Sequence, residues 1–458
     1  MKDLRQLFGT DGIRGVANLD LTPEFVVKVG KAGAKYLTEK NKKGQIVVGR
    51  DPRPSGDFIS GALISGILSS GANVLDAGII TTPAAAIITR LLDADGGIVI
   101  SASHNPLEDN GIKFFSRGGH KLTDLQEKLI EDFILGSSKE NNDNNDKQNI
   151  PLGADVGRYK RLENSYDIYT DYLISNFNLN LRGLKIALDC ANGAVSALAP
   201  VVLEKFGAEV ISFNDDISGE LINKNCGSTH PEVLTKIITE SKADIGFTYD
   251  GDGDRVIAAD SFGRILDGDI IIGFCAIDMA AKGILKNNSV VTTVMANMGF
   301  DKVLESKGIK VYKTKVGDRY VLEKMIEIDS ILGGEQSGHI IFRNLSPTGD
   351  GIISTLEFLN VLVNNNYNLE KIYDLIPKYP QILKNVKVKE KIKILSDENL
   401  KLKIKDLENR LGNTGRILVR PSGTEPVIRV MVEAQTIELA EKNVSLIIEE
   451  IEKISGKS

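Results

Sequence analysis

The chain of 458 residues contains no tryptophan and only three cysteines. Cys190, Cys226 and Cys275 stand far apart and form no Cys-x-x-Cys pair. This spacing argues against a disulfide framework and against a thiolate zinc site, and it fits a reducing compartment. We therefore expect a cytoplasmic protein.

Long apolar runs are missing as well. The opening MKDLRQLFGTDGIRG lacks the apolar core of a secretory signal, and no stretch approaches the ~20 uninterrupted apolar residues of a membrane span. We therefore expect no membrane partner. A formal net charge of −6 argues against bulk binding of nucleic acid, so local positive groups would have to hold any anionic ligand.

The common nucleotide and acyl-transfer motifs are absent too. The sequence has no Walker A loop, no Gly-x-Gly-x-x-Gly fingerprint and no Gly-x-Ser-x-Gly nucleophile elbow. Chemistry that depends on ATP, on NAD or on a serine-hydrolase triad is therefore disfavoured.

Three consecutive parts of the chain share one pattern. Continuous β-branched runs alternate with amphipathic segments, which predicts βαβ units with buried, mostly parallel strands. We expect strands at 45–50, 72–77, 96–101, 184–190, 208–213, 244–250, 289–294, 310–314 and 330–334. We expect helices between them at 56–70, 82–93, 194–206, 231–242, 299–307 and 317–328.

The C-terminal part has a different pattern. Residues 384–390, 415–419 and 427–434 alternate like strands with one solvated face, and 437–454 has the period of a helix. The sequence therefore predicts an α/β protein, with three similar doubly wound domains that contain mixed, mostly parallel sheets, followed by an α+β domain. We expect domain boundaries of 1–155, 156–258, 259–372 and 373–458.

Each α/β repeat ends its last strand in an unusual polar loop. The loop ASHNP follows the first repeat, DGDGDR ends the second and EQSGH ends the third. Ligands of such sheets bind beyond the carboxyl ends of the strands. We therefore expect one site that is assembled from all three loops.

The loop DGDGDR alternates glycine with Asp250, Asp252 and Asp254. Three crowded carboxylates repel one another without a counter-ion, and hard oxygen ligands suit Mg²⁺ or Ca²⁺. An EF-hand is excluded because Arg255 and Ser261 occupy the positions that need Gly and Glu. We predict a metal site, with a solvated acidic turn as the alternative, and Arg255 is placed to hold a phosphate beside it.

The segment RPSGTEPVIR concentrates groups that bind anions. Arg420 offers a bidentate fork, Ser422 and Thr424 offer hydroxyls, Gly423 permits close backbone approach, and Arg429 adds charge. We predict a phosphate site here, with a tight polar hairpin as the alternative.

The loop GGEQSGH contains Glu335, Ser337 and His339. These three side chains share one face if the loop is extended, and together they suit the vicinal hydroxyls of a sugar. Three other glycine-containing loops, FGTDGIRG (8–15), GRDPRPSG (49–56) and KVGDRYV (315–321), contain basic residues, and each loop taken alone is interpreted as a solvated turn. These residues are Arg14, Arg50, Arg53, Lys315 and Arg319.

The segment ISASHNPLEDNGIK places Ser103 beside His104. Neighbours on an extended chain point to opposite faces, so adjacency alone makes no catalytic pair. Near a divalent metal, arginines and a phosphate site, Ser103 suits phosphoryl transfer through a phosphoserine, with Lys113 reaching back as a positive group. We expect His104 to fix the loop and Asn110–Gly111 to shape a turn. An exposed polar turn is the alternative.

In this order, ASHNP, DGDGDR, GEQSGH and RPSGTEP resemble the α-D-phosphohexomutases, and the resemblance covers essentially the whole chain. It implies four domains around a central cleft, the last being a mobile phosphate-binding lid. It implies phosphorylation of Ser103. It also implies that Asp250, Asp252 and Asp254 bind one Mg²⁺ per subunit, with a phosphoryl oxygen on Ser103 completing the shell.

The resemblance also implies roles for the remaining residues. Lys113 and His339 match proposed acid/base positions, and Arg14 matches a transition-state contact. Glu335 and Ser337 match contacts to sugar hydroxyls. The site of the non-reacting phosphate matches Arg420, Ser422, Gly423, Thr424 and Arg429.

With Gln336, the loop GEQSGH resembles that of the bacterial subgroup that acts on glucosamine phosphates. Relatives that act on mannose or glucose phosphates usually carry Met or Pro at this position. CGSTHPE (226–232) and KVGDRYV (315–321) are similar to the same subgroup. The resemblance implies interconversion of glucosamine 6-phosphate and glucosamine 1-phosphate through the 1,6-bisphosphate. This reaction would supply UDP-N-acetylglucosamine and cell-wall precursors, and relatives suggest a homodimer.

Three alternatives remain open. The first is a mutase that prefers glucose or mannose phosphates, since it would share every loop. The second is a metal-bound protein that binds sugar phosphates without turnover. The third is a simple phosphatase.

Overall fold

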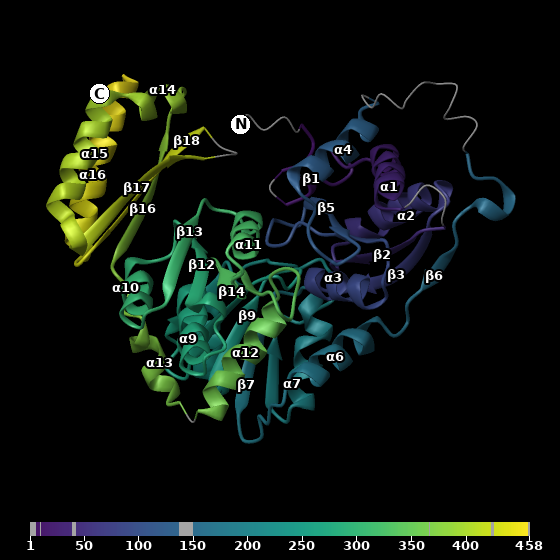
Figure 1. Ribbon diagram of the computed structural model, residues 1–458, viewed down its shortest axis with the longest axis horizontal. Helices are drawn as coiled ribbons and strands as arrows, with labels where there is room; N and C mark the ends of the chain where they lie inside the picture. Colours follow the sequence, from purple (N-terminus) through teal and green to yellow (C-terminus); the bar gives the residue numbers. More distant parts are fainter. Residues whose placement is uncertain are drawn as a thin grey trace. The chain divides into compact units, whose positions relative to one another are not determined.

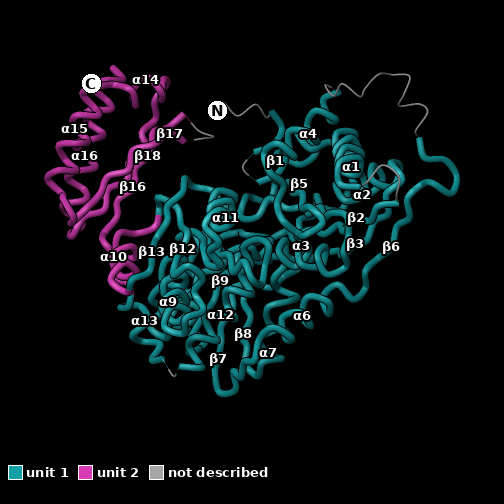
Figure 2. The backbone as a smooth tube through the Cα atoms, in the orientation of Figure 1, with its two compact units in different colours: residues 1–295, 308–375 teal, residues 296–307, 376–458 magenta. Residues whose placement is uncertain are grey.

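The computed structural model describes residues 6–9, 11–38, 43–136, 150–365, 367–422 and 426–456. The chain divides into two compact units (Figure 2). The first unit comprises Met1–Met295 and Gly308–Leu375, and the second comprises Ala296–Lys307 and Ile376–Ser458. No helix in the described ranges is both long and apolar enough to cross a bilayer.

The first sheet of the first unit has six strands in the order β1-β5-β4-β2-β3-β6 (Figure 1). Strands β4, β2, β3 and β6 are parallel to one another. Strand β5 pairs antiparallel with β4, and β1 pairs antiparallel with β5. The strands are β1 Ile13–Val16, β2 Gln45–Arg50, β3 Asn73–Ile79, β4 Gly96–Ile100, β5 Asp109–Ser116 and β6 Tyr159–Arg161. The helices are α1 Pro23–Leu37, α2 Ser55–Ser69, α3 Thr82–Leu91 and α4 Asp124–Ile134.

Helices cover both faces of this sheet. Ile46 and Val48 belong to the core cluster that contains residues of α1 and α2, whereas α3 packs against β2 and β4. The alternation of side chains along β2 therefore buries both of its faces, which explains why its sequence is continuously apolar.

The hairpin between β4 and β5 corrects one expectation. Asn110 and Gly111 do not shape a turn, because both lie inside β5 and pair with β1. The turn lies earlier, where the Asn105 N–H donates to Ala102 O at 3.1 Å. As a result, Lys113 lies opposite Val99, one residue from the carboxyl end of β4.

The second sheet has the order β11-β10-β9-β7-β8, with β9, β7 and β8 parallel. Its strands are β7 Lys185–Asp189, β8 Glu209–Phe213, β9 Ile245–Tyr249, β10 Val256–Asp260 and β11 Ile265–Leu266, with helices α7 Ala199–Lys205 and α8 Pro231–Ser241. The helix expected over 194–206 is broken into a 3-10 turn, Ala194–Ala197, and α7. Pro200 lies in the first turn of α7 because it has no N–H for a helix interior.

The third sheet has the order β13-β12-β14-β15. Its strands are β12 Ser289–Thr293, β13 Lys310–Thr314, β14 Leu332–Gly334 and β15 Ile340–Phe342. Its helices are α9 Gly268–Ala281, α11 Asp318–Glu327, α12 Gly351–Asn364 and α13 Leu369–Leu375, and α6 Ser165–Asn176 precedes the second sheet. The three cysteines are free and buried.

The second unit contains an antiparallel sheet in the order β16-β18-β17. Its elements are α10 Met298–Ser306, β16 Gln381–Lys387, α14 Lys391–Ser396, α15 Glu398–Leu411, β17 Gly415–Pro421, β18 Val427–Ala434 and α16 Ile437–Ser455. The segment before α10 joins this unit because Arg416 donates to Ala296 O at 2.6 Å. Three mixed α/β sheets followed by an antiparallel C-terminal sheet confirm the predicted fold class.

A pair of glycines on α2 gives a stability test. A Cβ on Gly66 would collide with the backbone oxygen of Val27 in α1, whereas a Cβ on Gly61 would meet nothing within 4 Å. We predict that Gly66→Ala lowers the free energy of unfolding by about 1–3 kcal/mol. The control Gly61→Ala is expected to raise it by about 0.5–1 kcal/mol, because alanine restricts the unfolded chain.

Urea denaturation of both full-length variants, followed by circular dichroism, measures these shifts. Equal midpoints for the two variants would contradict the close approach of α1 and α2.

Candidate active site

The three polar loops come together in the first unit. The hydroxyl of Ser103, after β4, donates to Asp250 Oδ2, after β9, at 2.5 Å. Arg255 forms an isolated antiparallel bridge with His339, which follows β14. Loops that follow the carboxyl ends of strands in three separate sheets therefore contribute to one cluster of polar side chains.

Ser103 is buried and adopts a left-handed backbone conformation with φ 55°. This conformation corrects the assumption of an extended chain, because it brings His104 Nδ1 to 3.2 Å from Ser103 Oγ. Burial lowers the pKa of His104 to about 4, and the charges of Arg255 and Arg14 act in the same direction. His104 is therefore a neutral imidazole at pH 7, in contact with the hydroxyl. Ser103 itself is therefore not exposed, whereas Pro106, Leu107 and Glu108 of the same turn are.

The three aspartates of DGDGDR are all buried. Each offers a carboxylate oxygen, and these oxygens lie within 4.8 Å of one another. The Oδ1 atoms of Asp252 and Asp254 are buried and accept no hydrogen bond. Burial raises the pKa of Asp250, and the charges of Asp254 and Asp252 raise it further. Because unpaired buried carboxylate oxygens are costly, this donor set fits a metal ion, and the solvated-turn alternative is wrong.

Asp252 is also held by the first α/β sheet. Thr82, at the start of α3, donates its hydroxyl to Asp252 Oδ2 at 2.5 Å. Lys113 Nζ lies 2.8 Å from the same oxygen. Burial raises the pKa of Asp252, but Lys113 and Thr82 outweigh burial and the net pKa is lowered. Thr82 was missed because its position in the first turn of a helix is the only signal that its local sequence contains.

Lys113 is buried among carboxylates. Its Nζ lies 2.8 Å from Asp11 Oδ2 and 3.8 Å from Asp254 Oδ2, in addition to Asp252. Burial lowers the pKa of Lys113, but the charges of Asp11, Asp252 and Asp254 outweigh burial and the net pKa is raised. Lys113 therefore keeps its proton in this arrangement.

A chain of alternating charges links Lys113 to His339. Asp11 accepts from Lys121 at 2.7 Å, Lys121 also pairs with Asp318, and Asp318 Oδ2 lies 3.4 Å from His339 Nε2. Burial raises the pKa of Asp318, but Lys121 and His339 outweigh it and lower the pKa to about 2. Sequence reasoning missed Asp11, Lys121 and Asp318, because no local pattern connects partners so far apart in the chain.

The loop that contains Glu335, Ser337 and His339 is not extended. The Gly338 N–H donates to Glu335 O at 3.0 Å, and the Glu335 N–H donates to His339 O at 2.9 Å, so the loop is a tight turn between β14 and β15. Ser337 is exposed and His339 is buried. Since this turn is closed, the extended-loop argument for three side chains on one face fails. Glu335 Oε1 instead accepts from the N–H of Gly317 at 3.0 Å.

Some basic residues interpreted as parts of solvated turns are not solvated. Arg53 is completely buried, and Arg319 is buried and pairs with Asp124 and Glu127 of α4. Arg14 is partly buried and pairs with Asp11. Each of these arginines pairs with a carboxylate, and the local sequence does not reveal these pairs.

In the second unit, Arg420 and Arg429 face each other across β17 and β18. Burial lowers the pKa of Arg420, and the charge of Arg429 lowers it further. Like charges directly opposite one another are unfavourable, and a bound anion would relieve the repulsion. Ser422 is buried nearby, with its N–H donating to Val427 O at 3.0 Å. Gly423 and Thr424 lie outside the described residues.

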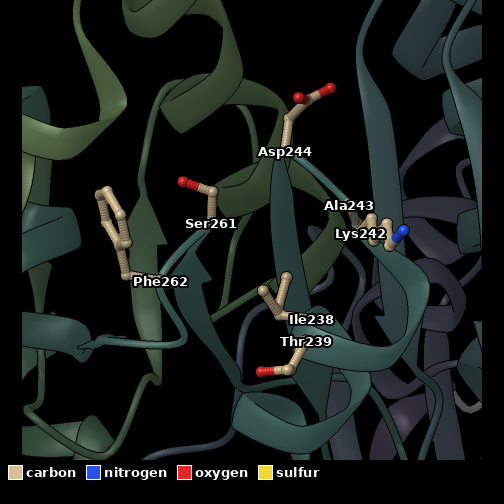
Figure 3. Close-up of a pocket in the computed structure, with 7 residues that line it drawn as sticks. All are labelled: Ile238, Thr239, Lys242, Ala243, Asp244, Ser261 and Phe262. Atoms are coloured by element: carbon tan, nitrogen blue, oxygen red, sulfur yellow. The ribbon is translucent and has the colours of Figure 1, made fainter.

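A surface cavity of about 480 Å³ occurs elsewhere on the second sheet (Figure 3). It is lined by Ile238, Thr239, Lys242, Ala243, Asp244, Ser261 and Phe262. Asp244 immediately precedes β9, so the cavity lies at the amino end of that strand. The charged groups of Lys242 and Asp244 point in different directions (Figure 3). The cavity is therefore remote from the edge where ligands of parallel sheets bind.

Comparisons with known proteins cover almost the entire chain. Family models for phosphoglucomutase/phosphomannomutase match in four parts: alpha/beta/alpha domain I over residues 5–141, domain II over 167–263, domain III over 267–379 and the C-terminal domain over 383–449.

Two curated relatives are bacterial phosphoglucosamine mutases. The protein from Caldanaerobacter subterraneus is 49% identical over 434 residues, covering 94% of this chain and 95% of the relative. The protein from Carboxydothermus hydrogenoformans is 49% identical over 450 residues, covering 98% and 100%.

Among solved structures, a phosphoglucomutase/phosphomannomutase family protein from Burkholderia thailandensis aligns with a TM-score of 0.79 at 23% identity, covering 98% of this chain and 97% of that one. N-acetylphosphoglucosamine mutase from Aspergillus fumigatus, solved with GlcNAc-6P and magnesium, aligns with a TM-score of 0.72 at 19% identity, covering 99% and 97%. At these identities the two structures support the fold alone. Taken with the sequence relatives, the chain belongs to the phosphoglucomutase/phosphomannomutase family, the α-D-phosphohexomutases.

Proposed function

We propose that this chain is an isomerase that interconverts glucosamine 6-phosphate and glucosamine 1-phosphate, through a phosphoserine at Ser103 and the 1,6-bisphosphate. The observation that carries the proposal is the contact of 2.5 Å between Ser103 Oγ and a carboxylate of the buried aspartate cluster. Relatives that are 49% identical over nearly their full length are phosphoglucosamine mutases, which supports this substrate. The product would enter the synthesis of UDP-N-acetylglucosamine and cell-wall precursors.

Asp250, Asp252 and Asp254 would hold one Mg²⁺ per subunit, together with an oxygen of the phosphoryl group on Ser103. The two buried Oδ1 atoms that accept no hydrogen bond support this assignment. When bound, the ion would neutralise charge that develops on the phosphoryl oxygens.

In the transfer step, the bond between phosphorus and Ser103 Oγ breaks and a bond to the sugar hydroxyl forms. Arg14 and Arg255 are candidates for contacts to the phosphoryl oxygens, since Nε of each is buried without a hydrogen-bond partner. Lys113, which is protonated in this arrangement, and His339, beside Asp318, are the two candidates for the acid and the base that serve Ser103 Oγ and the sugar hydroxyl. His104 would hold the loop and contact the serine oxygen.

Binding of the sugar would involve Glu335 and Ser337. The non-reacting phosphate would lie in the second unit on Arg420, Ser422, Gly423, Thr424 and Arg429. A separate phosphate site is required because either end of the sugar must be held while the other reacts. We further propose four domains, 1–155, 156–258, 259–372 and 373–458, the last of which would carry the site for the non-reacting phosphate. The homodimer and the cytoplasmic location stay predictions.

A coupled assay tests the substrate. We predict that the purified protein with Mg²⁺ converts glucosamine 6-phosphate with a kcat/KM at least about tenfold above that for glucose 1-phosphate. The reason is that relatives in this subgroup act on amino-sugar phosphates. An acetyltransferase and a uridyltransferase detect the glucosamine 1-phosphate formed.

Ser103→Ala tests phosphoryl transfer through this serine. We expect the variant to fold but to lose turnover by about 10³-fold or more. Ser175→Ala, on the exposed end of α6, is expected to keep full turnover. A preference for glucose or mannose phosphates would show that the substrate is one of these sugar phosphates and not a glucosamine phosphate. Release of free phosphate alone would indicate a phosphatase.

Removal of the metal gives an independent prediction. We expect EDTA to abolish turnover and Mg²⁺ to restore it. Because Asp252 contributes one of the clustered oxygens, Asp252→Asn should weaken Mg²⁺ binding by at least about tenfold. Calorimetric titration with Mg²⁺ measures this directly, without an activity readout.

The exposed Asp57 provides the control, since Asp57→Asn should bind Mg²⁺ like the unaltered protein. Equal Mg²⁺ affinity in the two variants would remove Asp252 from the metal site.

A further inference from the structure

Arg53 follows β2 and has no exposed side-chain surface. Its Nε pairs with Asp51 Oδ2 at 3.1 Å. The two terminal nitrogens donate to backbone carbonyls of the serine loop: Nη2 to Ser103 O at 3.1 Å and to Asn105 O at 2.8 Å, and Nη1 to Pro106 O. One guanidinium therefore binds three carbonyl oxygens within four residues of the serine loop.

Asp51 extends this contact to the other side of Ser103. The hydroxyl of Ser101 donates to Asp51 Oδ2 at 2.6 Å. The N–H of Ser103 donates in turn to Ser101 Oγ at 2.9 Å. Both the N–H and the carbonyl of Ser103 are thus connected to the buried pair of Arg53 and Asp51.

Asn223, in the connection between β8 and α8, contacts the same carbonyl. Asn223 Nδ2 donates to Ser103 O at 2.8 Å and lies 3.4 Å from Asn105 O. Its own loop lies close against the residue before Arg53, since a Cβ on Gly219 would collide with Pro52 O. Two separate parts of the chain therefore hold one carbonyl oxygen.

These contacts coincide with an unusual backbone. Ser103 has φ 55°, a left-handed conformation that is unfavourable for a residue with a Cβ and persists only when its surroundings hold it. The same conformation directs Oγ toward Asp250. A relaxed loop would move the hydroxyl away from the aspartate cluster.

We propose that Arg53 is a positioning residue for phosphoryl transfer, which with Asp51 and Asn223 holds Ser103 in the conformation that directs its hydroxyl at the metal-binding carboxylates. This inference rests on the proposed function, because the position of Oγ matters only if Ser103 carries the phosphoryl group. Lysine cannot replace Arg53, since a single ammonium nitrogen cannot reach Asp51 and the separate carbonyls at once.

The test compares Arg53→Lys with Arg264→Lys. Arg264 is a matched control because it also pairs with a buried aspartate, Asp260, at 2.6 Å and donates to a backbone carbonyl, Glu370 O, at 2.6 Å, away from the serine loop. We expect both variants to unfold cooperatively. Arg53→Lys should lower kcat by about tenfold to a hundredfold, because small displacements of a reacting group cost this much. KM should change by less than about twofold in both variants.

A second readout follows the phosphorylation of Ser103 itself. Intact mass spectrometry follows the rate at which Ser103 is phosphorylated by glucosamine 1,6-bisphosphate, and Arg53→Lys should slow it by about the same factor as kcat. If Arg53→Lys does not fold, Asn223→Gly takes its place, because glycine keeps the left-handed backbone of Asn223 and removes the amide. Its control is Asn288→Gly, a left-handed asparagine whose amide donates to Gly308 O at 2.6 Å.

A kcat and a phosphorylation rate equal to those of the matched control, in a folded Arg53 or Asn223 variant, would overturn the inference. Absence of turnover in the unaltered protein would instead overturn the proposed function. The two failures are therefore distinguishable in one set of measurements.

Discussion

The mutual repulsion of three buried carboxylates determines the arrangement of the site. Asp250, Asp252 and Asp254 place oxygens within 4.8 Å of one another in the interior. Lys113 and Thr82 both contact Asp252 Oδ2, and Ser103 donates to Asp250 Oδ2. The oxygens that accept nothing are those that a cation would bind. The same negative charge that would destabilise an empty cluster would therefore attract a divalent cation, which the proposed phosphoryl transfer would use.

This constraint explains why residues from separate sheets meet at one point. The first sheet contributes Ser103 and Lys113, the second contributes the aspartates, and the third contributes His339. Lys121 connects the first and third sheets by bridging Asp11 and Asp318. Because each charge in this chain is buried beside an opposite one, removal of a single member would leave its neighbour uncompensated. The network therefore fixes the positions of Lys113 and His339 relative to each other.

Much of the fold is predictable from local patterns. The strand expected at 45–50 is Gln45–Arg50, because a β-branched run between polar ends specifies a buried parallel strand. The helix α9 was missed, since it is buried on almost every side and so has no amphipathic period. The strand β5 was missed because Asp-Asn-Gly is typical of a turn, although here these three residues pair with β1.

The candidate site, like the fold, can be predicted from the sequence only in part. The aspartates and Ser103 stand in short distinctive motifs, so their chemistry can be inferred from the sequence. Arg53 stands among prolines in a segment typical of a solvated loop, and only the three-dimensional contacts reveal its burial. Lys121 and Asp318 pair across 197 positions of the chain, which no local pattern encodes.

The central claim is that the phosphoryl group moves between Ser103 and the sugar. Its most direct test is a single-turnover experiment in which the protein, labelled with ³²P on Ser103, is mixed with unlabelled glucosamine 6-phosphate and Mg²⁺. The account predicts that the label leaves the protein and appears in glucosamine phosphates. Label that stays on the protein, or that appears only as inorganic phosphate, would contradict it.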